Sequence, residues 1–198
     1  MIAAARPLSS APPRILPPFP TAAALALEAA THAELELAFV RGETPNLDDL
    51  VGWEFRGINH PAWARIAGIK KFVKGFFRDG DTVFGYNCPV EQNVLDGRWR
   101  TKPTDDAPKR FGFYKVAPVD PTSRDNFYLH SVLLDYGKGG NKPWDPTGGL
   151  RDYVVQVDEH NPDLFLGKAY YALGPLRVHS NFFILERHRP GLTDFARR

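Results

Sequence analysis

Apolar and polar residues alternate along the last third of the chain, in segments that glycine, proline or asparagine separates. A period of two residues is typical of β-strands, whose successive side chains point to opposite faces of a sheet. Turn-forming residues between such segments favour antiparallel neighbours joined by short connections. The pattern predicts four consecutive strands at 126–136, 151–157, 164–171 and 176–187.

The preceding part of the chain adds shorter strand candidates at 52–57 and 111–116. Residues 69–78 are ambiguous, because their apolar side chains recur at helical spacing and could form an amphipathic helix. A glycine interrupts this pattern, and Asp79-Gly80 is typical of a hairpin turn before a strand at 82–86. We favour the hairpin.

The N-terminal part predicts an extended arm and then a helix. Six prolines within residues 1–20 disfavour regular structure there. Thr21 is a good N-cap, and the alanine-rich segment 21–41 has high helix propensity. Gly42 suits the residue after this helix, and its expected apolar face is formed by Leu27, Ala30, Leu37 and Val40. A short capped turn is expected at 46–51, and a further short helix at 60–67.

These elements predict a mainly β fold, in which residues 50–190 form one antiparallel barrel of about eight to ten strands. The helix at 21–41 is expected to pack outside the barrel. The predicted organisation is a proline-rich arm at 1–20, a single barrel domain at 21–190 and a C-terminal tail at 191–198.

Three short motifs occur in an order known from one barrel family. They are Gly52-Trp53 on the first strand, Arg151-Asp-Tyr153 near the later strands, and Phe182-Phe-Ile-Leu-Glu-Arg187 before Pro190. Together they resemble the lipocalin-like barrels of the calycin superfamily. Gly52-Trp-Glu-Phe-Arg-Gly57 and the closing Leu185-Glu-Arg187 also resemble bacterial Gly-x-Trp-x-Gly domains of unknown function. The resemblance implies a lipocalin-like β-barrel in which Trp53 closes one end and the guanidinium of Arg187 stacks on its indole ring.

Composition narrows the class of protein. The net charge is only +2 and the basic residues are spread along the chain, so nucleic-acid binding is not expected. No apolar run is long enough for a membrane span, and no apolar segment of signal-peptide length precedes the first prolines. With a single cysteine, Cys88, no internal disulfide can form. We therefore expect a soluble cytoplasmic protein.

Polar and aromatic side chains on the late strands are the candidates for a pocket, because apolar walls bind a small molecule and a few polar groups orient it. The ligand-binding candidates are His130, Tyr136, Trp144, Tyr153, Tyr170, His179, Asn181 and Phe182. The histidines lack ligand spacing, so neither a metal nor a cofactor is expected. The catalytic residues are unknown, since the acidic residues Asp135, Asp152, Asp158 and Glu186 are expected to pair with nearby basic residues.

The expected function is binding of a small hydrophobic or amphipathic molecule inside the barrel. The ligand would enter opposite Trp53, with the glycine-rich loop 137–149 acting as a flap that carries Trp144. One alternative is a cofactor-independent isomerase or cyclase that acts on an apolar substrate in the same cavity. Another is an interaction protein, whose arm and helix dock on a partner or on a second copy in a homodimer.

Overall fold

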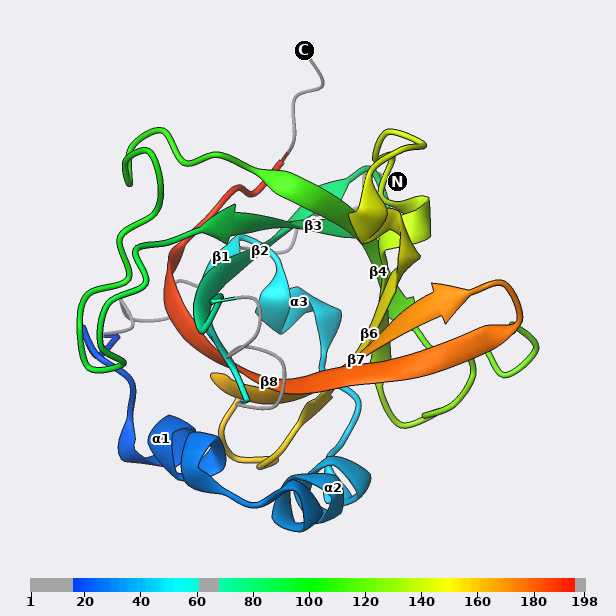
Figure 1. Cartoon of the computed structure of the whole chain (residues 1–198), viewed down its shortest axis with the longest axis horizontal. Helices are drawn as coiled ribbons and strands as arrows, with labels where there is room; N and C mark the ends of the chain where they lie inside the picture. Colours follow the sequence, from blue (N-terminus) through cyan, green and yellow to red (C-terminus); the bar gives the residue numbers. More distant parts are fainter. Residues whose placement is uncertain (1–15, 61–67, 195–198) are drawn as a thin grey trace, which may run out of the picture.

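The computed structural model describes residues 16–60 and 68–194, and its centre is a closed antiparallel β-barrel (Figure 1). Each strand pairs with the next along the chain, and β8 closes the barrel by pairing with β1. The mainly β class and the single barrel are thus confirmed, with eight strands among the described residues. The strands are β1 Trp53–Asn59, β2 Lys71–Asp79, β3 Thr82–Pro89, β4 Phe111–Pro118, β5 Val132–Asp135, β6 Leu150–Gln156, β7 Leu164–Leu173 and β8 Leu176–Pro190.

The ambiguous segment 69–78 belongs to a hairpin, as favoured above. Strands β2 and β3 pair from Phe72 opposite Pro89 to Asp79 opposite Thr82. Gly80 in the turn has a φ of 57°, a conformation that glycine adopts without steric cost. The turn therefore decides against the helical reading of this segment.

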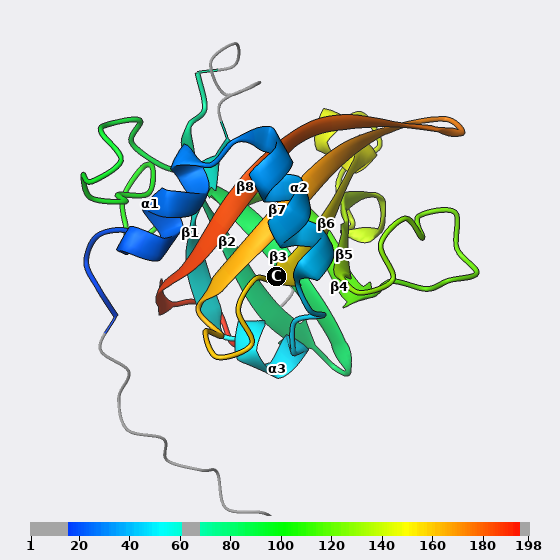
Figure 2. The same ribbon diagram turned by 90° about the horizontal axis from the view of Figure 1, so that it is seen from below.

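The single helix expected over 21–41 is wrong, because the structure has two. Helix α1 spans Ala22–Ala29 and α2 spans His32–Arg41. Between them, Thr31 starts a new helix through a capping box: its side chain accepts a hydrogen bond from the Glu34 backbone, and the Glu34 carboxylate accepts one from the Thr31 backbone. Both helices lie outside the barrel along β7 and β8, as expected (Figure 2).

The break between the helices also changes the face that α2 buries. Leu35 and Phe39 are fully buried, whereas Leu37 is 48% exposed and Val40 is 60% exposed. The apolar face expected from a continuous helix is therefore wrong for this half. Gly42 follows the last residue of α2. A Cβ added at Gly42 would lie 2.6 Å from the Val155 side chain, so the backbone passes close to the sheet there.

The strand expected at 126–136 is much shorter in the structure. Only Val132–Asp135 is a strand, because the chain turns just before it, where the backbone and the hydroxyl of Ser131 both donate to the Tyr128 carbonyl. The capped turn at 46–51 is confirmed as the short helix α3, Leu47–Leu50, with Asn46 as N-cap. The helix expected at 60–67 lies, apart from His60, outside the described residues.

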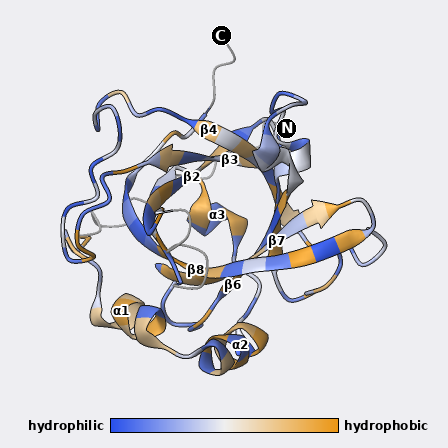
Figure 3. Cartoon of the chain, in the orientation of Figure 1, coloured by the Kyte–Doolittle hydropathy of each residue, from blue (hydrophilic) through white to orange (hydrophobic). Residues whose placement is uncertain are grey.

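Apolar and polar residues alternate in the first part of β8, Leu176-Arg177-Val178-His179, and give way to the apolar run Phe182-Phe-Ile-Leu185 further along the strand (Figure 3). The interior holds a cluster of buried apolar side chains that includes Phe55, Phe76, Tyr114, Phe165 and Leu185. A second cluster fills the space between the outer face and α1, α2 and the long loops.

Aromatic rings cover glycines on neighbouring strands of the barrel wall. A Cβ added at Gly57 would lie 2.2 Å from the Phe72 ring, and a Cβ added at Gly167 would lie 2.0 Å from the Phe183 ring. Each of these glycines is paired with its aromatic residue across the strands. The missing side chain is thus what lets the ring lie against the wall, so these glycines are needed for packing.

One end of the barrel is closed by α3 and by the contact expected from the family resemblance. The guanidinium carbon of Arg187 lies 4.7 Å from the centre of the Trp53 ring, which confirms the contact. Arg187 is buried and its Nε donates to the Asp163 carboxylate at 2.6 Å. Trp53 itself is half-buried.

Candidate functional site

The end of the barrel opposite Trp53 contains a cavity of about 210 Å³. Its wall includes Asn59, at the far end of the strand that Trp53 begins. The other lining residues come from β2, β3, β4, β6, β7, β8, the loop 137–149, and the positions Ile69 before β2 and Tyr136 after β5. The apolar lining residues are Ile69, Phe72, Phe111, Leu150, Ala169 and Phe183.

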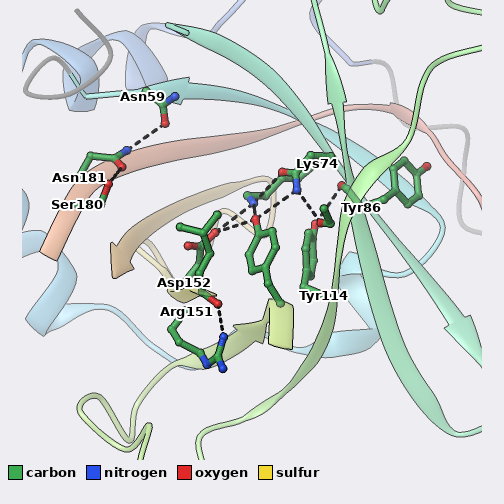
Figure 4. A network of polar contacts seen from close by, with 12 residues as sticks. Asn59, Lys74, Tyr86, Tyr114, Arg151, Asp152, Ser180 and Asn181 are labelled. Carbon is green, nitrogen blue, oxygen red and sulfur yellow. Dashed lines mark hydrogen bonds and ion pairs between the residues drawn. The ribbon is translucent and has the colours of Figure 1, made fainter. Parts of the chain in front are cut away.

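Four of the polar side chains that line this cavity meet around the ammonium group of Lys74 on β2 (Figure 4). Lys74 Nζ lies 3.1 Å from Asp152 Oδ2 on β6 and donates to Asn87 Oδ1 on β3 at 3.0 Å. It also donates to the hydroxyl of Tyr136, which directly follows β5. These four side chains, all at most 9% exposed, form the Lys74 cluster.

The neutral members of the Lys74 cluster complete the network. The Tyr136 hydroxyl donates to Asp152 Oδ2 at 3.1 Å. The Asn87 amide donates to the Gly112 carbonyl at 2.9 Å and to Tyr136 at 3.3 Å. Asp152 Oδ1, by contrast, is buried and has no hydrogen-bond partner among the described residues.

Burial controls the protonation of the Lys74 cluster. It lowers the pKa of Lys74, because the charged ammonium loses its hydration, and the ion pair with Asp152 opposes this effect. Burial and the Asp152 charge raise the pKa of Tyr136 well above its ordinary value, so Tyr136 stays neutral and donates its proton. The ammonium is further held near aromatic rings, with its nitrogen 4.8 Å from the Tyr114 ring centre and 5.3 Å from that of Phe183.

Of the ligand-binding candidates from the sequence, Tyr136 and Asn181 line this cavity. Asn181 lies near the mouth, where its amide donates to Asn59 Oδ1 at 3.0 Å. The structure therefore brings these two candidates together with Lys74, Asn87 and Asp152. Their role in binding stays a prediction.

Five other candidates lie on the outer face, beneath α2 and the segment 127–130, and none of them lines the cavity. Phe182 packs 5.2 Å from the ring of His32 on α2. The five are His130, Tyr153, Tyr170, His179 and Phe182.

A bulge separates His179 from Asn181, which strict alternation would place on one face. Ala169 is opposite Asn181, but the next residue, Tyr170, is opposite His179, so β8 has one extra residue here, Ser180. The extra residue reverses the alternation of side chains along β8. Asn181 consequently faces the cavity, while His179 contacts Tyr170 on the outer face at a ring distance of 5.3 Å.

Trp144 lies on the loop 137–149 and is 76% exposed. It lines a second hollow of about 420 Å³ beside Tyr136 and Tyr171, next to the main cavity. This position agrees with the expected place of the loop at the open end. Movement of the loop as a flap stays a prediction.

Two of the four acidic residues pair with basic residues as expected, whereas the Asp158 carboxylate accepts a hydrogen bond from the His160 backbone. Asp135 lies 3.2 Å from Arg151 and Glu186 lies 2.9 Å from Arg56. Asp152 differs, since its partner Lys74 was not among the candidates. The sequence does contain a signal that identifies Lys74. If 71–79 is a strand, Lys74 lies on the same face as Phe72 and Phe76, and a charged residue is unusual on such an apolar face.

The comparisons with known proteins identify no family for this chain. The chain matches no family model, and neither a curated protein nor a solved structure matches it. None of the helices in residues 16–60 and 68–194 has the length and apolar character needed to cross a membrane. Within the same residues, no group of three or more His, Cys, Asp or Glu side chains is arranged to hold a metal ion.

Proposed function

We propose that this protein binds a compact amphipathic molecule in the open end of its barrel. One observation carries the proposal: a mostly apolar cavity has a buried ion pair, Lys74 with Asp152, in its wall. Burying two charges costs free energy that the attraction between them only partly returns, so an apolar pair would serve stability as well or better. Apolar walls with a few fixed polar groups are the usual composition of a small-molecule site.

The size of the cavity limits the ligand. Pockets for drug-sized ligands usually have volumes of at least about 300 Å³, whereas this cavity has a volume of about 210 Å³. The interior therefore suits a small ring or a short chain, or one end of a longer molecule that extends past the mouth. A long acyl chain enclosed by the barrel does not fit this volume.

The eight-stranded barrel and the Trp53–Arg187 contact support kinship with lipocalin-like barrels, which we include in the proposal. The isomerase or cyclase alternative would need a basic carboxylate beside the substrate. Asp152 Oδ2 is already engaged by both Lys74 and Tyr136, so we favour binding over proton abstraction by this carboxylate. The homodimer and the cytoplasmic location stay predictions.

Binding can be tested by titrating the protein with small substituted benzenes and following backbone amide chemical shifts. We expect saturable binding, with a Kd below about 1 mM, and shifts concentrated on the strands around the cavity. Ala169→Leu should abolish binding by filling the cavity, since Ala169 is in its wall. Ala172→Leu, a matched change on the same strand away from the cavity, should bind normally. No binding by the unmodified protein would refute the proposal.

A further inference from the structure

The hydrogen-bond donors of the Lys74 cluster are all engaged within the protein. A lysine ammonium has three protons, and Lys74 directs one each to Asp152, Asn87 and Tyr136. The single proton of Tyr136 goes to Asp152, and both amide protons of Asn87 have acceptors as well. The cluster thus has no free proton for a ligand.

The acceptors of the same cluster are not all engaged. Asp152 is 3% exposed and lies in the cavity wall, and its Oδ1 has no partner in the part of the chain that the structure describes. A buried carboxylate oxygen without a donor is costly, because it has lost its hydration and gained nothing in return. A donor supplied by a ligand would remove this cost.

The charges around Asp152 select among ligands with donors. Lys74 and Asp152 neutralise one another, so the cavity presents no net charge from this pair. An ammonium ligand at Oδ1 would be repelled by the nearby Lys74 ammonium in a medium of low dielectric constant. A carboxylate ligand would face Asp152 and find no free donor. A neutral hydroxyl compound meets neither penalty.

We propose that the cavity is selective for small neutral alcohols or phenols, whose hydroxyl donates to Asp152 Oδ1 while the apolar body lies against Phe72, Leu150 and Phe183. The inference rests on the proposed binding function and adds the chemical class of the ligand. It follows from the free acceptor, the engaged donors and the neutral ion pair. A hydrogen bond to a charged acceptor out of water is strong enough to dominate selectivity among ligands of equal size.

A set of probes that share a p-tolyl group tests this selectivity. p-Cresol has a hydroxyl donor, 4-methylanisole only an acceptor, p-toluate a negative charge and 4-methylbenzylamine a positive charge. In the full-length protein at pH 7, we expect p-cresol to bind at least about 10-fold more tightly than 4-methylanisole. The two charged probes should bind more weakly than p-cresol.

Two variants assign the preference to Asp152. The double variant Lys74→Met with Asp152→Leu replaces the pair by apolar side chains of similar size, a change that buried ion pairs often tolerate. It should still bind 4-methylanisole, and its preference for p-cresol should fall to about 3-fold or less. As control, Lys168→Met with Glu36→Gln removes a lysine–glutamate pair between the outer face of the barrel and α2, away from the cavity, and should keep the full preference.

The outcomes separate the two proposals. Equal binding of p-cresol and 4-methylanisole, or tighter binding of p-toluate, overturns the selectivity while the binding function stands. A preference that persists in the double variant also overturns it. If no probe of the set binds at all, the proposed function fails and the selectivity fails with it.

Discussion

Replacing only one member of the Lys74–Asp152 ion pair should destabilise this barrel more than replacing both. Asp152→Leu leaves the Lys74 ammonium at 3% exposure without its counter-ion, and Tyr136 loses the acceptor of its hydroxyl proton. Removing one partner of a buried pair typically costs about 3–5 kcal/mol. We therefore expect the free energy of unfolding to fall by about that amount at pH 7.

The double variant Lys74→Met with Asp152→Leu removes both desolvation penalties together. Its free energy of unfolding should lie within about 1 kcal/mol of the unmodified protein, or above it. The measurement is urea unfolding of the two single variants and the double variant, which gives the coupling energy directly. The pair Lys168–Glu36 on the outer face, whose carboxylate is 36% exposed, is the control and should show a smaller coupling than the Lys74–Asp152 pair.

The pH dependence gives a second readout of the same variant. Burial lowers the pKa of Lys74 below that of an unfolded lysine, and Asp152→Leu removes the charge that opposes this effect. Between the folded and unfolded pKa values, the unfolded state binds more protons, so stability rises with pH. The loss in Asp152→Leu should therefore be smaller at pH 9 than at pH 7. A loss below about 1 kcal/mol at pH 7, or one independent of pH, would refute the account of the ion pair.

The barrel could be predicted from the sequence because its signals are local. Alternation with period two and turn residues such as Asp79-Gly80 act within a few residues of each other, and the structure has the corresponding strands. The break at Thr31 is also local, since the capping box with Glu34 is visible in the sequence. It was missed because high alanine content favoured one continuous helix.

The cavity could be predicted only in part, because its residues are far apart in the sequence and come together only in the folded barrel. The bulge at Ser180 follows from the pairing of β7 with β8, so alternation alone placed His179 and Asn181 on one face. Lys74 and Asp152 meet only once β2 and β6 face one another across the closed barrel. No local rule relates two such residues, whereas a charge on the apolar face of a strand does identify Lys74 as unusual.

Three further changes test the packing and the charges of the barrel. Trp53→Ala should cost about 2–3 kcal/mol in urea unfolding, less than the roughly 3–5 kcal/mol of a fully buried aromatic residue, because Trp53 is half-buried; an unchanged midpoint would contradict its role at the closed end. Gly167→Ala should cost about 1–3 kcal/mol or more, because the new Cβ would lie 2.0 Å from the Phe183 ring, whereas Gly148→Ala meets no atom within 4 Å and should be nearly neutral. The last change concerns His188, whose pKa burial and two neighbouring arginine charges lower to about 4. An unfolded histidine titrates near pH 6.5, so between these values the unfolded state binds more protons and the folded state loses stability as the pH falls. The full loss from pH 6.5 to 4 is on the order of 3 kcal/mol. His188→Gln removes this titration, so its free energy of unfolding should change less over that range than that of the unmodified protein, as measured by urea unfolding at half-unit pH steps. Parallel pH profiles for the two proteins would show that His188 is not held neutral in the folded barrel.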